Sequence, residues 1–208
     1  MGKDIIAQGA EAKLYIGTID GQRVLVKERI KKSYRLPQID EKLRKTRTKE
    51  EAKLLTEARR LGVLTPKILD LTDDKIFMEF IDGKRVKELL NSSDEKAVAD
   101  VCLSIGKNVG KLHAANIVHG DLTTSNMILA KDGITFIDFG LGGFSKRMED
   151  KAMDLKLLHQ ALQSTHWKIL RLCWDNILKG YKQEYIEAEE VMQKIGEIEK
   201  RARYAKRD

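Results

Sequence analysis

The sequence contains little proline and little cysteine, two residues of each in 208. Cys102 and Cys173 lie far apart in the chain and show no CxxC spacing, which argues against a cysteine metal site or a disulfide framework. No apolar run approaches the ~20 residues that cross a membrane, and the first residues lack the long apolar segment of a signal peptide. Because Ile6 stands where N-myristoylation needs Ser or Thr, no lipid anchor is expected. We therefore expect a cytoplasmic protein without a membrane partner and with two reduced core thiols.

The chain is also short of acidic residues relative to basic ones, since 32 Asp and Glu against 39 Lys and Arg give a formal net charge of +7. The basic residues concentrate in two runs, at 29–49 and at 200–207. Such runs favour a polyanionic partner such as a nucleic acid, and the alternative is the solvated face of a helix. The composition, 42% hydrophobic and 34% charged, predicts a folded globule and not a disordered chain.

The first part of the chain is rich in strand patterns. Residues 4–30 alternate apolar and polar side chains around an Asp-Gly pair at 20–21, which is typical of a two-residue hairpin. Residues 39–61 carry apolar side chains at helical spacing, and a glycine follows them. A second hairpin is predicted around 73–74. Residues 1–82 are therefore expected to form a small antiparallel sheet with one main helix.

The second part of the chain is mainly helical. A capped helix is predicted at 94–115, short strands at 127–130 and 134–141, and helices after them. An apolar stripe at 167–178 is expected to be core. The sequence thus predicts an α+β fold with two lobes, in which 83–208 form a reduced, mainly helical second lobe that ends in a basic tail.

The chemistry concentrates in one constellation, HGDLTTSN at 119–126 followed by Asp138 in a DFG triplet at the end of a strand. Phosphoryl transfer needs little covalent work from protein groups, so a site must orient the attacking oxygen and neutralise phosphate charge with a metal. Asp121 can accept the proton of the attacking hydroxyl or water, whereas Asn126 and Asp138 offer the oxygen ligands that Mg²⁺ prefers. Each segment alone is typical of a turn or a strand end. Together these residues supply the groups that a phosphoryl-transfer site needs.

These two segments resemble the HxDxxxxN catalytic loop and the DFG metal-binding motif of the protein-kinase superfamily. The resemblance implies the bilobal protein-kinase fold, with Lys27 as the third-strand lysine that contacts the α- and β-phosphates of ATP. Its implied partner is Glu51 on the following helix, and the neighbouring Glu50 is the alternative. Glu51 lies on the apolar side of that helix, whereas Glu50 points further away.

The same resemblance identifies the segments expected to contact the nucleotide. The loop QGAEA at 8–12 holds one glycine where typical kinases have three, so fewer backbone N–H groups can close over the phosphates. Gly9 and Ala10 are the loop residues expected at the phosphates. The hinge of kinases implies that the adenine is held by main-chain groups of Glu79 and Ile81, with Met78 behind it.

The GAEA loop is similar to that of one branch, the PRPK-type small atypical kinases, which are the kinase subunit of the KEOPS complex that installs threonylcarbamoyl on adenosine 37 of certain tRNAs. Further matches to this branch are RTKEEA, Gly62 with Pro66, MEFIDG, HGDLTTSN, DFGLG and EDKAMDL at 149–155. The resemblance implies an ATPase and atypical serine/threonine kinase subunit that uses ATP and Mg²⁺, with Mn²⁺ as an alternative ion. It also implies as partners a TsaD-like threonylcarbamoyl-transferase subunit, the other KEOPS subunits and tRNA.

Departures from ordinary protein kinases are equally informative. Gly120 replaces the arginine that reads a phosphorylated activation loop, Thr123 replaces the catalytic-loop lysine, and no APE motif follows. Free protein-kinase activity should therefore be poor. The resemblance implies instead that phosphate is released during the tRNA-modification cycle and that Asp154 anchors the catalytic loop.

The basic C-terminal tail fits contact with tRNA, because cationic side chains bind phosphates and an aromatic ring can stack on a base. The basic helix that carries Lys45, Arg47 and Lys49 either assists this contact or is only solvated. The tail residues expected to contact tRNA or the transferase subunit are Lys200, Arg201, Arg203, Tyr204, Lys206 and Arg207.

Two other functions remain open at this stage. A small-molecule kinase of the aminoglycoside or choline type also uses an HGDxxxxN loop, but it would need a larger helical insert to shape a substrate pocket. A non-catalytic RNA-binding scaffold with a kinase fold should have lost Lys27, Asp121 or Asp138, and all three are present.

Overall fold

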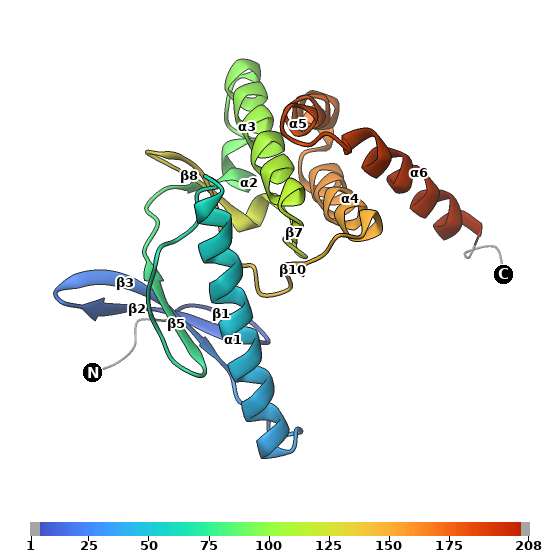
Figure 1. Ribbon diagram of the computed structural model, residues 1–208. Coiled ribbons are helices and arrows are strands. Elements are labelled where there is room, and N and C mark those ends of the chain that lie inside the picture. The colour runs from blue at the N-terminus through green and yellow to red at the C-terminus, as the bar shows by residue number, and fades with distance from the viewer. Residues whose placement is uncertain (1–4, 205–208) are drawn as a thin grey trace.

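The computed structural model describes the backbone of residues 5–204 and the side chains of residues 5–201. The chain separates into a sheet-rich first half and a helical second half, with helix α1 (Pro37–Arg60) lying against the sheet (Figure 1). The architecture is the α+β fold that the sequence predicts, a small antiparallel sheet with one main helix followed by a reduced helical lobe.

The sheet has five antiparallel strands in the order β1-β2-β3-β5-β4. Between β2 and β3, Asp20 and Gly21 both have positive φ, 50° and 76°, which is the two-residue turn whose twist matches that of paired strands. On β3, successive side chains alternate between the two faces, so Leu25, Lys27 and Arg29 share one face. The strands are β1 (Ile5–Gln8), β2 (Ala12–Ile19), β3 (Gln22–Arg29), β4 (Ile68–Leu71) and β5 (Lys75–Glu79).

Helix α1 connects the two halves. It begins at Pro37, where a proline loses no helical hydrogen bond, and it ends just before Gly62, whose φ of +77° reverses the chain. Its buried residues Leu54, Leu55 and Ala58 join the main hydrophobic core of the helical half. The position of α1 is therefore fixed by contacts with both halves.

The second half contains five α-helices and two small sheets within the described residues. The side chain of Asp94 accepts a hydrogen bond from the backbone N–H of Ala97 at 2.9 Å and caps α3. Both cysteines are buried and free. The helices are α2 (Val86–Leu89), α3 (Glu95–Ala114), α4 (Met148–Thr165), α5 (Leu170–Glu184) and α6 (Ala188–Tyr204), with single 3-10 turns η1 (Thr124–Asn126) and η2 (Trp167–Ile169). The sheets are β6 (Lys84–Arg85), β8 (Met127–Ala130) and β9 (Gly133–Phe136), and the pair β7 (Ile117–Val118) with β10 (Gly143–Phe144).

Four features differ from the sequence prediction. The strand predicted at 134–141 ends at Phe136, because Asp138 adopts a left-handed conformation that no strand continues through. The two-residue strands β6, β7 and β10 were not predicted, because a pair of residues has no periodicity. The apolar stripe predicted at 167–178 holds from Leu170 onward, where α5 begins. Trp167 precedes that helix in a 3-10 turn and is 68% exposed, so the prediction that it is core was wrong.

Among residues 5–204, the helices are all too short or too polar to cross a membrane.

Helices α3 and α5 approach each other at glycines. A Cβ atom on Gly106 would lie 2.0 Å from the carbonyl oxygen of Ile177, and one on Gly180 would lie 2.2 Å from that of Leu103. Real Cβ atoms do not approach backbone oxygen so closely, so either side chain would push the helices apart.

We expect Gly106→Ala to lower the free energy of unfolding by about 1–3 kcal/mol or more, as overpacking of a rigid core does. Urea denaturation of the purified protein measures this. Gly196→Ala is the matched control, since no atom lies within 4 Å of its Cβ position and alanine favours a helix by about 0.5–1 kcal/mol. Equal effects of the two substitutions would contradict the close approach of α3 and α5.

Candidate functional site

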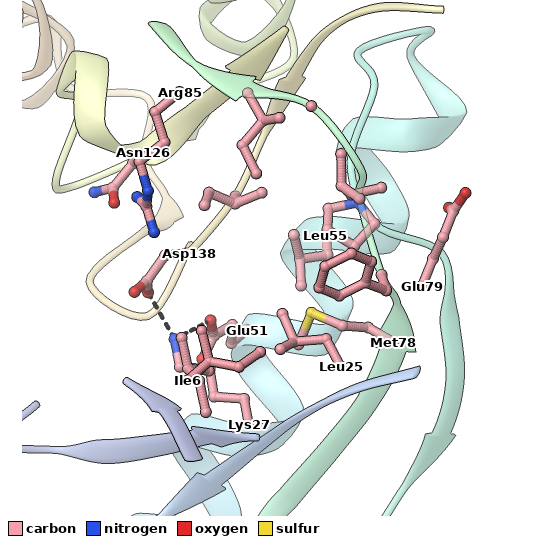
Figure 2. A pocket seen from close by; sticks show the side chains of 17 residues that line it. Ile6, Leu25, Lys27, Glu51, Leu55, Met78, Glu79, Arg85, Asn126 and Asp138 are labelled. Carbon is pink, nitrogen blue, oxygen red and sulfur yellow. Dashed lines mark hydrogen bonds and ion pairs between the residues drawn. The ribbon is translucent and has the colours of Figure 1, made fainter. Parts of the chain in front are cut away.

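The centre of the site is a buried lysine held by carboxylates. Lys27 on β3 donates hydrogen bonds of 2.6 Å to Glu51 of α1 and of 2.6 Å to Asp138 (Figure 2). The structure therefore makes the contact expected between Lys27 and Glu51, whereas Glu50 is exposed. Burial opposes the charge on Lys27, but the Glu51 and Asp138 carboxylates outweigh it and raise the pKa of the lysine. Lys27 is thus a fixed cation at the junction of the two halves.

A second cation completes the surroundings of Glu51. The Nη2 atom of Arg29 donates to the other carboxylate oxygen of Glu51 at 2.6 Å. Glu51 is 1% exposed, and each of its two oxygens contacts one cation. A buried carboxylate is tolerated only when it is paired in this way.

Asp138 lies just after β9, in a left-handed backbone conformation with φ of 61°. Its Oδ1 atom accepts hydrogen bonds from Lys27 and, at 3.2 Å, from the backbone N–H of Gly140. Partial burial would raise the pKa of this carboxyl, but the charge and hydrogen bond of Lys27 outweigh burial and hold its pKa below the usual range. Asp138 is therefore ionised at neutral pH and is half exposed, with 48% of its side chain accessible.

Asp121 and Asn126 are joined by two hydrogen bonds across the catalytic loop. The Nδ2 atom of Asn126 donates to the backbone oxygen of Asp121 at 2.9 Å and to its carboxylate at 2.8 Å. Because the amide nitrogen faces Asp121, the amide oxygen of Asn126 is the atom left to hold a cation. This donor set of one amide oxygen and the Asp138 carboxylate fits a magnesium ion that takes its other ligands from phosphates and water.

The described residues contain no group of three or more His, Cys, Asp or Glu placed to hold a metal ion by themselves. A cation at Asn126 and Asp138 would therefore need oxygen ligands from a bound phosphate. That requirement is the usual one for magnesium in phosphotransferase sites.

The catalytic loop is anchored from below by Asp154 of α4. Its carboxylate accepts the backbone N–H groups of His119 at 2.5 Å and Gly120 at 2.8 Å. A Cβ atom on Gly120 would lie 2.1 Å from the backbone oxygen of Leu141, and Gly120 has a φ of +78°. The close approach of the segment after Asp138 thus explains why this position is glycine where ordinary kinases have arginine.

Two neutral histidines pack beside this anchor. His113 contacts Asp154 at 3.4 Å and the hydroxyl of Tyr181 at 2.8 Å, and His119 contacts the backbone oxygen of Ile137 at 3.1 Å. Burial lowers the pKa of His113 in spite of the Asp154 carboxylate, and burial likewise lowers the pKa of His119.

We expect the free energy of unfolding to fall as the pH falls below about 6.5, the ordinary histidine value. Above that pH neither state binds the protons, whereas below it the unfolded chain binds protons that buried His113 and His119 do not. The slope should be about 1 kcal/mol per pH unit for each histidine. Urea denaturation at pH 7.5 and 5.5 measures it, and His113→Gln should reduce it. Identical stability at both pH values would contradict the buried neutral histidines.

An apolar cavity of about 270 Å³ lies between the two halves, next to Lys27 (Figure 2). Met78, Glu79 and Ile81 line one side of it, so the predicted hinge residues do lie at this cavity. Lys27, Glu51, Asn126 and Asp138 line its polar end. Its walls suit a flat, apolar group such as a nucleobase, with the charged groups placed for phosphates.

A second cavity of about 370 Å³ adjoins the first at Lys27 and Asp138. It is covered by the β1–β2 loop, including Gly9 and Ala10, and Asp121 lies on its lining. The loop and acidic residues predicted from the sequence are therefore gathered at the same place, although they come from distant parts of the chain.

Some lining residues were missed by sequence reasoning. Arg85, which donates to the backbone oxygen of Ser125, belongs to a strand too short to predict. Arg29 was placed in a basic run, although its position two residues after Lys27 on a strand could have shown that both face the cleft. The other apolar residues on the walls of the first cavity are Ile6, Leu14, Leu25, Leu55, Pro66, Phe80, Ile128 and Ile137, of which Pro66 and Phe80 lie in the segments that match the kinase branch.

The described side chains of the tail, Lys200 and Arg201, line neither cavity. Helix α6 extends from the end of the molecule opposite the sheet (Figure 1). Arg201 forms an ion pair with Glu149 at 3.3 Å. Lys200 lies on the described part of α6, the side chains of Arg203 and Tyr204 lie outside the described residues, and so do Lys206 and Arg207 entirely. The basic run at 29–49 is largely paired, since Lys45 contacts Asp73 and Arg47 contacts Glu11, while Lys49 is exposed.

Comparison with known proteins adds to this geometry. The model of the RIO domain family matches residues 13–142. The chain is 46% identical to the KEOPS complex subunit Bud32 of Pyrococcus abyssi, over 98% of this chain and 97% of that protein. It is 42% and 43% identical to the probable bifunctional tRNA threonylcarbamoyladenosine biosynthesis proteins of Methanothermobacter thermautotrophicus and Methanosarcina mazei, over 97% of this chain. It spans only 36% of the length of each of these two proteins.

The solved structure of WaaP in complex with acyl carrier protein superposes with a TM-score of 0.68 over 98% of this chain and 88% of that one. The two sequences are 12% identical, so this similarity concerns the fold alone.

Proposed function

The chain belongs to the RIO domain family, and from that premise we propose that it is an ATPase subunit that supports threonylcarbamoyladenosine modification of tRNA. The family is one of atypical kinases, so ATP-dependent phosphotransfer is its general chemistry. We also propose that this chain has an atypical serine/threonine kinase activity.

One observation carries the proposal. Lys27 and Asp138 line both cavities where these adjoin, and Asn126 lines the first cavity beside them. Asp121 lines the second cavity and accepts a hydrogen bond from Asn126. This places a fixed cation, two oxygen ligands for a metal and a carboxylate base around one point, which is the set that phosphoryl transfer needs.

We assign the roles from these contacts. The adenine occupies the cavity lined by Met78, Glu79 and Ile81, and Lys27 contacts the phosphates. Asn126 and Asp138 would hold Mg²⁺, with Mn²⁺ as an alternative; when bound, the ion neutralises phosphate charge. Gly9 and Ala10 cover the phosphates from above.

In the reaction, the carboxylate of Asp121 accepts a proton from the attacking water while the oxygen of that water bonds to the γ-phosphorus. The bond between the γ-phosphorus and the bridging oxygen breaks, and ADP and inorganic phosphate are formed. Asn126 keeps the Asp121 carboxylate in place through its 2.8 Å hydrogen bond, and Asp154 keeps the loop in place through its backbone contacts.

The proposed partners follow from the relatives' names and from charge. The names of the relatives indicate a KEOPS complex and threonylcarbamoyladenosine biosynthesis, which supports a TsaD-like transferase subunit, other KEOPS subunits and tRNA as partners in the cytoplasm. The tail 200–208 and the exposed Lys49 of α1 are the proposed tRNA contacts.

A reconstitution tests the tRNA role. Purified transferase and accessory subunits are incubated with ATP, Mg²⁺, unmodified tRNA and the threonylcarbamoyl donor, with and without this chain, and the modified nucleoside is measured by mass spectrometry. We expect multiple-turnover formation of threonylcarbamoyladenosine only when the chain is present. Equal formation without it would refute a role in the modification.

A further inference from the structure

The second cavity has a basic end that the proposed catalytic roles leave unused. Arg29 and Arg47 line it together with Lys27, on the side of the β1–β2 loop and α1. Arg29 is 6% exposed, so its guanidinium is removed from bulk water. Its Nη2 atom contacts Glu51 at 2.6 Å and the backbone oxygen of Arg47 at 3.3 Å, but its Nε atom has no hydrogen-bond partner within the described part of the chain.

An unpaired buried N–H is unfavourable and uncommon, so it calls for an explanation, of which a bound water or ion is one. Arg29 is nine-tenths buried and lines the cavity, and an acceptor reaches its buried Nε–H only if this side chain or a neighbour shifts. The acceptor best matched to the Nε edge of a guanidinium is a carboxylate or phosphate oxygen.

Arg47 supplies a second, adjustable cation at this end. Its Nη1 atom contacts the carboxylate of Glu11 at 3.1 Å, and both side chains are partly exposed, 39% for Arg47 and 48% for Glu11. Exposed ion pairs of this kind contribute little free energy, so Arg47 can exchange Glu11 for another anion at small cost.

The position of these arginines relative to the catalytic groups is set by strand β3. Lys27 and Arg29 are two residues apart on one face, which separates their Cα atoms by roughly 6–7 Å. Lys27 contacts Asp138, which is one of the two proposed metal ligands. Arg29 lies two residues further along β3 and is therefore further from the reacting phosphate than Lys27.

The cavity also has acidic residues on its walls, which oppose the binding of an anion. Glu11, Asp121 and Asp138 line it as well, and each would repel an anion. Glu11 lies 3.9 Å from Arg35 and keeps that cation when Arg47 turns to another anion, and Asp138 contacts Lys27. The remaining carboxylate, Asp121, belongs to the catalytic loop rather than to the end formed by β3 and α1.

We propose that Arg29 and Arg47 form a subsite for inorganic phosphate, the anion that hydrolysis of ATP releases in the same cavity. The source of the phosphate rests on the proposed function, but the ability of the subsite to bind phosphate does not. Phosphate held there would leave the nucleotide position without passing the adenine cavity.

The test is binding of inorganic phosphate to the purified full chain by isothermal titration calorimetry at constant ionic strength, with and without saturating ADP and Mg²⁺. Arg47→Gln keeps the side-chain stem and removes the charge, and we expect it to weaken phosphate binding by about tenfold. Arg29→Lys keeps a cation beside Glu51 but removes the Nε–H, and a similar loss is expected. The affinity for adenosine, which carries no phosphate, should stay within about twofold in Arg47→Gln, because Arg47 is not among the residues that line the adenine cavity.

Lys49→Gln is the matched control, since Lys49 is exposed on the same helix and does not line the cavity. Equal weakening by Lys49→Gln and Arg47→Gln would show only diffuse electrostatic attraction and would overturn the subsite. So would unchanged phosphate affinity in Arg47→Gln and Arg29→Lys, or complete displacement of phosphate by ADP in the wild type.

Failure of the proposed ATPase function and failure of the phosphate subsite would give different results. If the chain does not hydrolyse ATP but binds phosphate through Arg47, the proposed function fails and the subsite stands. If it hydrolyses ATP and phosphate binding does not depend on Arg29 or Arg47, only the subsite fails.

Discussion

Asp138→Ala is expected to abolish release of phosphate from ATP while leaving tRNA binding largely intact. The substitution removes a carboxylate that is ionised at neutral pH and lies beside Lys27 and the amide of Asn126. Loss of a metal ligand removes several kcal/mol of charge stabilisation from the transition state, so turnover should fall by about a thousandfold or more. Binding of tRNA should change little, because the basic tail begins on α6, at the other end of the molecule (Figure 1).

The comparison needs a matched substitution that leaves the site alone. Asp175→Ala serves, because Asp175 is 65% exposed on α5 and only forms a surface ion pair with Arg171 at 3.6 Å. Phosphate release is measured by a coupled assay with Mg²⁺, and tRNA binding by filter retention at a fixed salt concentration. Parallel loss of both activities in Asp138→Ala would contradict the separation of the catalytic site from the tRNA-binding tail.

Glu51→Gln should produce the largest loss of stability among single changes at the site. The carboxylate of Glu51 is 1% exposed and pairs with both Lys27 and Arg29, so neutralising it leaves two buried cations short of a partner. Removal of one member of a buried ion pair costs about 3–5 kcal/mol. For a domain of this size, that corresponds to a fall in melting temperature of roughly 6–20 °C.

Glu50→Gln is the control for this experiment, because Glu50 is the neighbouring residue of α1 and is exposed. A surface substitution of that kind changes the free energy of unfolding by less than about 0.5 kcal/mol. Denaturation by urea with both variants gives the comparison. If Glu51→Gln is within 1 kcal/mol of Glu50→Gln, roughly the precision of such extrapolations, then the network around Glu51 is not the support that its geometry indicates.

The sequence predicted those parts of the fold that depend on local signals. Gly62 ends α1 in a left-handed conformation, and Asp94 caps α3 through its side chain, because a helix end is decided by a few neighbouring residues. The contact between Lys27 and Glu51 was expected from two motifs in fixed order, and the choice of Glu51 over Glu50 followed from helical periodicity. Local signals and ordered motifs therefore sufficed for the centre of the site.

The partners of the basic residues could not be predicted, because they lie far away in the sequence. Lys45 contacts Asp73 of the second hairpin, and Arg29 contacts Glu51 on the following helix. A basic run looks the same in the sequence whether its members are solvated, paired or buried. The need for glycine at position 120 was equally hidden, since it arises from the approach of Leu141. Trp167 escaped prediction because a stripe in the sequence does not show where a helix begins.

The destination of the γ-phosphate tests the central claim most directly. The chain is incubated with γ-labelled ATP and Mg²⁺, with and without the transferase subunit and bulk tRNA, beside Asp138→Ala. We predict that the label appears as free phosphate, that its release rises when the transferase subunit and tRNA are added, and that it vanishes in the variant. Accumulation of label on protein serine or threonine, whatever tRNA is present, would show that the chain is chiefly a protein kinase and would contradict the ATPase role.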